Sequence, residues 1–471
     1  MRALITPHRF SGTFRIPASK SHTIRKLLTA ALAEGTSVID YPLDSLDARS
    51  CVSVCRALGA DITEHRSADP ACANSADEKG EKLVRWTVRG LSRSSPFFRD
   101  SSRGVTCDAG NSGTTLFLAL AVAALGKGRV EFDGDEQIRR RSAGPLLDAL
   151  AGLGAAVKSA PGGCAPITVQ GPWKGGRVSL RCPTSQYLSA LLLASPLAPA
   201  GTVTEIDVPV LNERPYVEMT LSYLDAQGIP YETNRDFSYF RIPGGGAWKP
   251  VTGKTPGDFS SAAFPLCAGA VSGGPVTLLG LDPDDTQGDK AVCGILEKMG
   301  AKVRWEKTPD AGNPAGSWNL TVSRSGPLKG GEFDLNNTPD LLPVIAVTAC
   351  FAEGDTALVN AAHVRIKETD RIAVMAAELA GLGVKIEEKP DGLVIHGKGG
   401  ALNSPNAPLS GGKADGHGDH RVVMALAVGA LGAAGPLEID KAESAAVTYP
   451  GFLELLQATQ KKHVRKQPDV F

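Results

Sequence analysis

The sequence has no run of apolar residues that approaches the length of a membrane-spanning helix, and its first residues lack the apolar core of a signal peptide. It also has no excess of either charge. The 50 Lys and Arg residues equal the 50 Asp and Glu residues, whereas a nucleic-acid-binding protein normally has a basic excess. We therefore expect neither a membrane nor a nucleic acid as partner. The composition favours a cytoplasmic protein with a small ligand.

The nine cysteines form no C-x-x-C pair, and no other spacing typical of a metal site occurs. Cys51 and Cys55 lie one helical turn apart, where thiols pack more readily than they bind a metal. The sequence also lacks the phosphate loop G-x-x-x-x-G-K-[ST] and the dinucleotide fingerprint G-x-G-x-x-G. These absences argue against nucleotide hydrolysis and hydride transfer, and we expect neither a metal nor a cofactor.

A repeated pattern organises the chain, which at 471 residues is too long for one hydrophobic core. A helix end, a glycine and a short strand recur five times. Glycine suits the left-handed position that ends a helix, and the alternation that follows suits a half-buried strand. The five glycines are Gly59, Gly154, Gly228, Gly300 and Gly383.

The last helical pattern, residues 452–456, has no strand after it, whereas the strand at residues 2–5 has no repeat of its own. We predict that this N-terminal strand completes the last repeat. Residues 1–17 and 256–471 then form one domain, and residues 18–255 form a second domain inserted into it. Gly, Pro and short polar residues cluster at both predicted boundaries.

Residues 65–103 are polar, interrupted by Pro and Gly, and longer than an ordinary connection. We interpret this segment as a surface insertion that contains one strand, at residues 83–88.

The most charged segment, from His363 to Arg371, holds three cations, two carboxylates and an imidazole before an apolar helix that ends at Gly381. Free N–H groups and the macrodipole favour anions at a helix N-terminus, so we expect its backbone N–H groups and guanidinium to face one solvent pocket. A single segment of this kind could equally be an ion-paired, exposed helix start. The choice depends on the rest of the chain.

Five more helix starts carry cationic or hydrogen-bonding residues. They are residues 19–25, 108–115, 139–141, 184–186 and 419–421. Chance would scatter such residues over exposed faces, whereas here they recur at helix starts in both predicted domains. We infer a pair of anionic substrates held between the domains.

Together these segments resemble the 5-enolpyruvylshikimate-3-phosphate synthases (3-phosphoshikimate 1-carboxyvinyltransferases), a family of enolpyruvyl transferases, over nearly the whole chain. The most specific matches are residues 19–25, 110–114, 184–186, 287–289, 365–371 and 419–421. The resemblance implies a two-lobed, inside-out α/β fold. Each lobe has three βαβαββ repeats with helices inside and sheets outside, and the active site lies in the interdomain cleft.

The resemblance also implies a reaction. The enolpyruvyl group of phosphoenolpyruvate is transferred to the 5-hydroxyl of shikimate 3-phosphate and phosphate is released, a step of the shikimate pathway of aromatic amino-acid (chorismate) biosynthesis. The implied enzyme is a monomer without a cofactor. Asp340 would take the hydroxyl proton, Glu368 would give a proton to carbon and remove it again, and Lys20 would stabilise phosphate charge.

Binding roles follow from the same resemblance. Shikimate 3-phosphate would be held by Lys20, Ser21, Arg25, Thr184, Ser185, Gln186, Asp340, His363 and Lys367. Phosphoenolpyruvate would be held by Lys20, Gly113, Arg141, Gln186, Arg371 and Arg421. Asp47 and Asn111 would orient these groups.

Several positions depart from the common pattern of the family. Phe117 and Gln137 stand where Arg is frequent, Val447 where many members have Lys, Glu213 where a substrate-contacting Ser occurs, and His363 where Asn is often found. The loss of cations leads us to expect weaker binding of phosphoenolpyruvate than in a member with the full pattern.

Two alternatives remain open. The first is the related transferase that acts on UDP-N-acetylglucosamine, which usually has a reactive Cys in the loop that corresponds to residues 134–144. This chain has arginines and no Cys there. The second is a catalytically impaired relative that is retained as a binding protein.

Overall fold

The computed structural model of the protein describes residues 1–69, 72–91, 95–102, 104–310, 313–400 and 406–464. The chain divides into two compact units. The terminal unit consists of Met1–Pro17 with Pro256–Phe471, and the inserted unit consists of Ala18–Thr255.

The inserted unit contains three four-stranded sheets, and each has one parallel pair followed by two antiparallel pairs. The first sheet has the order β14 (Thr252–Lys254), β3 (Thr36–Asp40), β5 (Lys82–Arg89), β4 (Asp61–Ser67). The second has the order β6 (Gly104–Asp108), β7 (Arg129–Asp133), β9 (Cys164–Gln170), β8 (Ala156–Ala160). The third has the order β10 (Gly176–Cys182), β11 (Val203–Leu211), β13 (Tyr239–Pro243), β12 (Glu232–Thr233).

The terminal unit has three sheets, of which the first two follow the same plan and the third has one parallel and one antiparallel pair. The first has the order β2 (Gly12–Arg15), β15 (Val276–Leu281), β17 (Asn313–Ser323), β16 (Lys302–Asp310). The second has β18 (Leu328–Lys329) and β19 (Glu332–Asp334) beside β20 (Ala352–Val359), then β22 (Gly392–Lys398) and β21 (Lys385–Lys389). The third has the order β23 (Gly412–Asp415), β24 (Leu437–Asp440), β1 (Arg2–Ile5).

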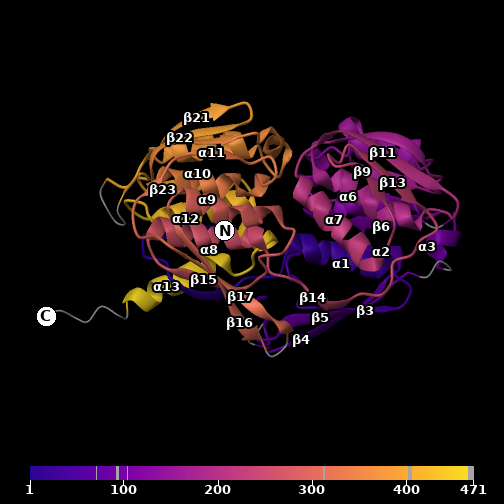
Figure 1. Ribbon diagram of the computed structural model, residues 1–471, viewed down its shortest axis with the longest axis horizontal. Helices are drawn as coiled ribbons and strands as arrows, with labels where there is room; N and C mark the ends of the chain where they lie inside the picture. Colours follow the sequence, from indigo (N-terminus) through magenta and orange to yellow (C-terminus); the bar gives the residue numbers. More distant parts are fainter. Residues whose placement is uncertain (70–71, 92–94, 103, 311–312, 401–405, 465–471) are drawn as a thin grey trace. The chain divides into compact units, whose positions relative to one another are not determined.

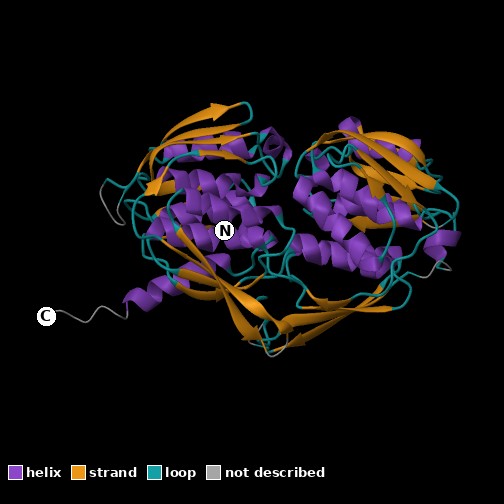
Figure 2. Cartoon of the chain, viewed as in Figure 1, coloured by secondary structure: helices purple, strands orange, loops and turns teal. Residues whose placement is uncertain are grey.

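Helices pack between the sheets within each unit, as Figure 2 shows. Those of the inserted unit are α1 (Lys20–Leu32), α2 (Leu46–Leu58), α3 (Pro96–Arg99), α4 (Gly113–Ala123), α5 (Gly144–Gly152), α6 (Ser185–Ala194) and α7 (Arg214–Gln227). Those of the terminal unit are α8 (Phe259–Ser272), α9 (Val292–Lys298), α10 (Leu342–Cys350), α11 (Arg371–Gly381), α12 (His420–Ala430) and α13 (Phe452–Val464).

Burial of whole helices confirms the expected inside-out α/β arrangement of three repeats per unit. Every residue of α4 is buried in the inserted unit, and so is every residue of α8, α10 and α12 in the terminal unit. A helix that is apolar on all sides must lie within a core, and these helices are rich in Ala, Leu and Val. Among the described residues, no helix is long and apolar enough to cross a membrane.

The five glycines of the repeated pattern behave as the sequence predicts. Gly59, Gly154, Gly228, Gly300 and Gly383 have φ values of 117°, 102°, 66°, 95° and 89°. L-residues with a side chain rarely adopt these values, so glycine ends each helix at low cost. The strands β4, β8, β12, β16 and β21 follow within a few residues.

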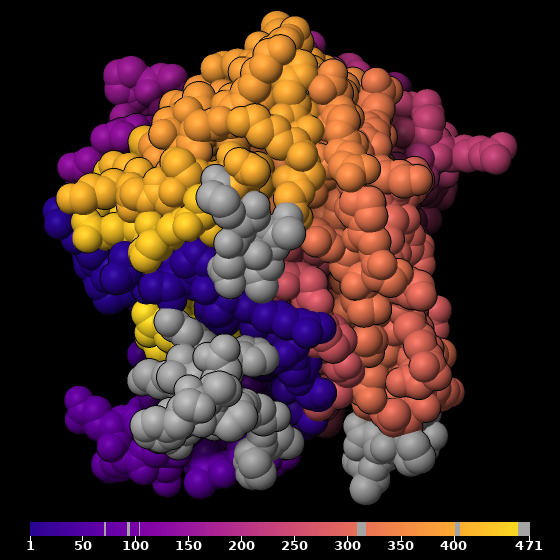
Figure 3. Space-filling view, turned by 90° about the vertical axis from the view of Figure 1, so that its left-hand side faces the viewer, coloured from indigo at the N-terminus to yellow at the C-terminus, as the bar shows by residue number. Residues whose placement is uncertain are grey.

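The N-terminal strand completes the last sheet, as the sequence predicts. β1 pairs antiparallel with β24, with Arg2 opposite Asp440 and Ile5 opposite Leu437. Figures 1 and 3 show the indigo start of the chain beside yellow residues near its end. Two further closures were not anticipated. β2 completes the sheet of β15, and β14 completes the sheet of β3, each by a parallel pair.

Residues 82–89 form β5, which confirms the strand expected at residues 83–88. The expectation that this strand belongs to a surface insertion is wrong. β5 lies between β3 and β4, and its Trp86 is 1% exposed. The strand therefore belongs to the first repeat and not to a surface insertion, because its alternate side chains cover the helices of the core. Residues 70–71, 92–94 and 103 of the segment lie outside the described residues.

The closure by β1 predicts different costs for two neighbouring substitutions. Ile5 is 1% exposed and Leu4 is 56% exposed on the same strand. Ile5→Ala should lower the free energy of unfolding by about 2–5 kcal/mol, because it leaves a cavity in the core, whereas Leu4→Ala should change it by about 0.5 kcal/mol or less. Denaturant titration of both variants tests this, and equal costs would contradict the packing of β1.

Candidate active site

The first cluster of the inserted unit forms where α1 and α2 begin. Ser19 caps α1, because its hydroxyl accepts a hydrogen bond from the His22 N–H. The next residue, Lys20, directs its Nζ atom to within 3.1 Å of Asp47 Oδ2 in the first turn of α2. The Lys20 side chain is 15% exposed and that of Asp47 is 5% exposed. The structure thus pairs the predicted cation with its predicted orienting carboxylate.

A second cluster lies at the start of α4. A Cβ atom placed on Gly113 would lie 2.8 Å from the Arg141 guanidinium carbon, so only glycine lets the guanidinium lie there undisturbed. The amide Nδ2 of Asn111 donates to Gln137 Oε1 (2.9 Å) and also to Asp135. The structure therefore brings Gly113 against Arg141, and Gln137 holds Asn111 where the family commonly has an arginine.

Arg25 lies deeper than the sequence suggests, with 1% of its side chain exposed. Its Nε donates to Thr220 Oγ1 (2.9 Å) and its Nη2 to Ser189 Oγ (3.2 Å) and to the Tyr216 carbonyl (3.2 Å). Its Nη1 donates to the carbonyl of Ser21 (3.3 Å), whose side chain is half-buried. Burial lowers the pKa of Arg25 to about 10. The guanidinium therefore joins α1, α6 and α7.

The third cluster lies at the start of α6. Thr184 caps this helix, because its hydroxyl accepts from the Gln186 N–H (3.5 Å). Thr184 and Ser185 are both buried, and both donate to the carboxylate of Glu213. Gln186 is half-buried. The predicted binding trio is thus assembled, and an internal carboxylate occupies it.

In the terminal unit the guanidinium of Arg371 joins three carboxylates. Its Nη1 lies 2.7 Å from Asp340 Oδ1, its Nη2 lies 2.7 Å from Glu368 Oε2, and its Nε lies 2.8 Å from Asp419 Oδ2. The Arg371 side chain is 1% exposed. Burial lowers its pKa, but the three negative charges outweigh this effect and the net pKa is raised. Arg371 is therefore permanently charged and held on three sides.

Asp340 connects this group to a second buried arginine. Its Oδ2 lies 2.7 Å from Nη2 of Arg421, whose side chain is 3% exposed. Among the described residues, the Nε of Arg421 is buried and has no hydrogen-bond partner. Asp340 lies in the 3-10 helix Pro339–Leu341, which puts it at the start of α10. The two predicted acid–base residues and the two predicted anion-binding arginines thus form one ion cluster.

The charged segment before α11 differs from the sequence-based expectation. The helix begins at Arg371 and Asp370 caps it, so Lys367 precedes the helix and is half-buried. His363 is 5% exposed in the 3-10 helix Ala362–Ile366. The expectation that the guanidinium of Arg371 faces solvent is wrong, because its carboxylate partners enclose it.

Sequence reasoning gave Asp289 and Asp419 no role, although both lie in segments that match the family. Asp289 is fully buried and accepts a hydrogen bond from Ser260. Burial, reinforced by the negative charge of Asp340, raises the pKa of Asp289 to about 7. Asp419 caps α12 and accepts from Arg371 and from Thr369. The sequence signal that could have identified both residues is a carboxylate at the start of a helix in a segment that matches the family.

Phe117 and Val447, two of the departures from the family pattern, lie in different surroundings. Phe117 is 3% exposed within α4, and its ring meets the Tyr187 ring edge-on at 5.1 Å between centroids. Substitution by Arg would place a charge in the core, so it would not simply restore an anion ligand. Val447 is half-buried at the end of the 3-10 helix Ala442–Val447.

Three repeats in each of two units, with ion clusters at helix N-termini, define the class: a two-unit α/β protein with buried charged groups. A sequence model of the family EPSP synthase (3-phosphoshikimate 1-carboxyvinyltransferase) matches residues 5–456. The chain belongs to this family. Among the described residues, no group of three or more His, Cys, Asp or Glu side chains is arranged to hold a metal ion.

Known proteins resemble the chain over nearly its whole length. The 3-phosphoshikimate 1-carboxyvinyltransferase of Acetivibrio thermocellus is 46% identical over 448 residues, which is 95% of each chain. That of Halobacterium salinarum is 41% identical and covers 97% of this chain and 98% of its own. The solved structure of an EPSP synthase from Acinetobacter baumannii has a TM-score of 0.75 at 27% identity and covers 97% of this chain and 98% of its own. These matches do not favour the UDP-N-acetylglucosamine alternative.

The buried carboxyl of Asp289 predicts a pH-dependent stability. An unfolded aspartate has a pKa near 4, so between about pH 4 and pH 7 the unfolded chain loses this proton before the folded chain does. The stabilising effect of the protonated form is complete below about pH 4 and is lost as the pH rises through about 7. Asp289→Asn cannot ionise and should exceed the parent in stability by about 2–4 kcal/mol at pH 8, but not at pH 4.

Denaturant unfolding at pH 4, 6 and 8 measures this difference. Asp284→Asn, at an exposed position of the same segment, is the matched control and should leave the pH profile unchanged. An Asp289→Asn effect of the same size at all three pH values would contradict the prediction.

Proposed function

We propose that this protein is a 3-phosphoshikimate 1-carboxyvinyltransferase. It transfers the enolpyruvyl group of phosphoenolpyruvate to the 5-hydroxyl of shikimate 3-phosphate and releases phosphate, in the shikimate pathway of aromatic amino-acid biosynthesis. The observation that carries the proposal is the 46% identity to a relative of that name over 95% of both chains. The assembly of Asp340, Glu368, Arg371 and Arg421 in one cluster supports it.

The reaction needs a base for the hydroxyl and an acid for carbon. We assign Asp340 to the hydroxyl proton, which it accepts as the hydroxyl oxygen adds to the enol carbon of phosphoenolpyruvate. Glu368 gives a proton to the methylene carbon, and it removes a proton from that carbon when phosphate leaves the tetrahedral adduct. Both carboxylates are bonded to Arg371, which supports fixed positions for them.

The binding roles belong to the same proposal. Shikimate 3-phosphate is bound by Lys20, Ser21, Arg25, Thr184, Ser185, Gln186, Asp340, His363 and Lys367. Phosphoenolpyruvate is bound by Lys20, Gly113, Arg141, Gln186, Arg371 and Arg421. Asp47 and Asn111 orient Lys20 and the loop before α4, a role that their contacts support. Within the terminal unit, we assign the direct contact with phosphoenolpyruvate mainly to Arg421. Three carboxylates already surround Arg371, whereas among the described residues the Nε of Arg421 has no hydrogen-bond partner.

One chain supplies a residue for every one of these roles, which supports a monomeric enzyme that works without a cofactor. We further propose that it acts in the cytoplasm.

A phosphate-release assay with purified protein tests the function. Shikimate 3-phosphate and phosphoenolpyruvate together should release phosphate, and either one alone should not. Release with UDP-N-acetylglucosamine in place of shikimate 3-phosphate would point to the related transferase. Binding of shikimate 3-phosphate without any release would point to an impaired relative.

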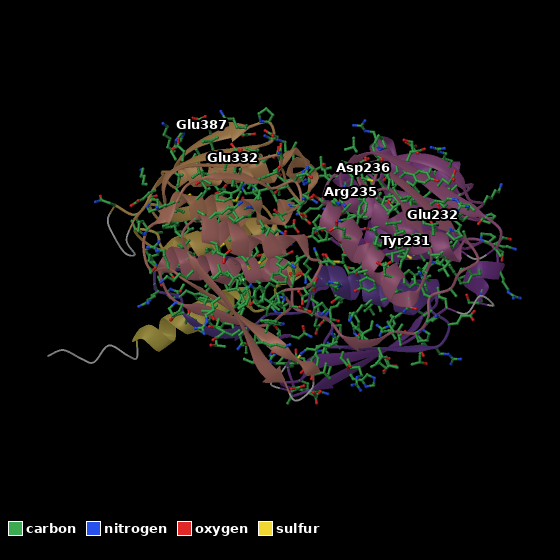
Figure 4. The ribbon with its side chains drawn as sticks, in the orientation of Figure 1. Tyr231, Glu232, Arg235, Asp236, Glu332 and Glu387 are labelled. Carbon is green, nitrogen blue, oxygen red and sulfur yellow. The ribbon has the colours of Figure 1, made fainter. Side chains whose placement is uncertain are left out.

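Substitution of the proposed acid on carbon should abolish turnover more than binding. Glu368→Gln keeps the size of the side chain but cannot transfer the proton, so kcat should fall about 10²–10⁴-fold. The Kd for shikimate 3-phosphate, measured by calorimetry without phosphoenolpyruvate, should change little. Glu332→Gln is the control, because Glu332 is exposed on β19 at the outside of the terminal unit (Figure 4). A kcat within about threefold of the parent would remove Glu368 from the mechanism.

A further inference from the structure

One oxygen of Glu213 collects three hydrogen bonds at the start of α6. Its Oε2 accepts from Thr184 Oγ1 (3.0 Å), from the Ser185 N–H (3.0 Å) and from Ser185 Oγ (2.8 Å). The carboxylate is buried, with Glu213 only 2% exposed. We call the two hydroxyls and this N–H the anion seat. All three groups donate to Glu213, so the seat suits an oxygen acceptor, and its hydrogen bonds are stronger when that oxygen is negatively charged.

The charge around the anion seat is also suited to an anion. The buried Arg25 gives its four hydrogen bonds to neutral oxygens, on Ser21, Ser189, Tyr216 and Thr220. Burial lowers the pKa of Arg25, and the negative charge of Glu213 is one of the influences that raise it again. Among the residues that the structure describes, no carboxylate accepts a hydrogen bond from Arg25, and such a buried guanidinium favours a nearby negative charge. Glu213 supplies one from within the chain.

The backbone of Glu213 is strained in the conformation that places its carboxylate in the anion seat. Glu213 has φ 59° and ψ 38°, in the left-handed region that residues with a side chain seldom adopt. It precedes Arg214-Pro215 at the start of α7, so it lies on a connection between two elements and not within a helix. Strain of this kind persists only where other contacts offset it, and the three hydrogen bonds of the seat are such contacts.

We propose that Glu213 is an internal competitor of the substrate: in the free protein its carboxylate occupies the anion seat, and the phosphate of shikimate 3-phosphate enters only when that carboxylate leaves. The inference rests on the proposed function, which assigns Thr184 and Ser185 to shikimate 3-phosphate. A carboxylate and a phosphate cannot share the seat, because both need the same three donors and their charges repel. Glu213 therefore sets the affinity for the phosphorylated substrate.

Two substitutions separate the charge of Glu213 from its bulk. Glu213→Gln keeps the length but removes the charge, and Glu213→Ser removes both the charge and the reach. Each should bind shikimate 3-phosphate more tightly than the parent when titrated by calorimetry without phosphoenolpyruvate. We expect about tenfold tighter binding for Glu213→Ser, the equivalent of one charged hydrogen bond, and a smaller gain for Glu213→Gln.

The matched control is Glu232→Gln, since Glu232 is an exposed carboxylate on β12 of the same unit (Figure 4). It should leave the Kd unchanged. Thermal unfolding of each variant shows whether it is folded. Inorganic phosphate, titrated as a second probe, should follow the same order of affinity, which ties the effect to the phosphate group and not to the ring hydroxyls.

The outcomes are distinct. If the parent releases phosphate in the enzymatic assay but folded Glu213→Ser and Glu213→Gln bind shikimate 3-phosphate no more tightly, the inference is wrong and the proposed function stands. Weaker binding by both would show that Glu213 positions Thr184 and Ser185 for the substrate. If the parent releases no phosphate, the proposed function fails, whatever the affinity of the variants for inorganic phosphate.

Discussion

The buried guanidinium of Arg371 is the constraint on which the geometry of the terminal unit depends. It joins Asp340 before α10, Glu368 before α11 and Asp419 at the cap of α12. Three carboxylates crowded in this way repel one another, so each is held in place by its bond to an arginine and not by the other carboxylates. The same contacts that position the proposed acid and base therefore also join three separate chain segments.

The inserted unit solves the problem of buried charge in another way. Its Arg25 bonds to hydroxyls and carbonyls, and Lys20 meets one carboxylate, Asp47. Among the described residues, each of these two cations has fewer acidic partners than Arg371, which has three. Glu213 brings a carboxylate to the start of α6, and it reaches there from another element. Neighbouring carboxylates therefore compensate the positive charge of Arg25 less than that of Arg371, which leaves more of it available to an anionic ligand.

Much of the fold follows from local sequence signals. Glycine at positions such as Gly59 and Gly300 has a local cause, a left-handed helix end, and the strand after it is read from alternation. The closing strands β2 and β14 escaped prediction because they are three or four residues long and carry little apolar pattern. Contacts of the site escaped for a different reason. Nothing near Arg371 in the sequence shows that Asp419, 48 residues away, encloses it, and nothing near Thr184 points to Glu213.

Helix caps show where substrate anions should bind. In the inserted unit the caps of α1, α2, α4 and α6 are hydroxyls, contributed by Ser19, Ser45, Ser112 and Thr184. In the terminal unit the caps of α8, α11 and α12 are carboxylates, contributed by Asp258, Asp370 and Asp419. A carboxylate cap already compensates the positive end of the helix dipole, whereas a hydroxyl cap leaves it available. At α6 the carboxylate of Glu213 provides this compensation, and at α2 Asp47 lies in the first turn. The first turns of α1 and α4 have no acidic residue, so free phosphate charge is better stabilised at these two helix starts.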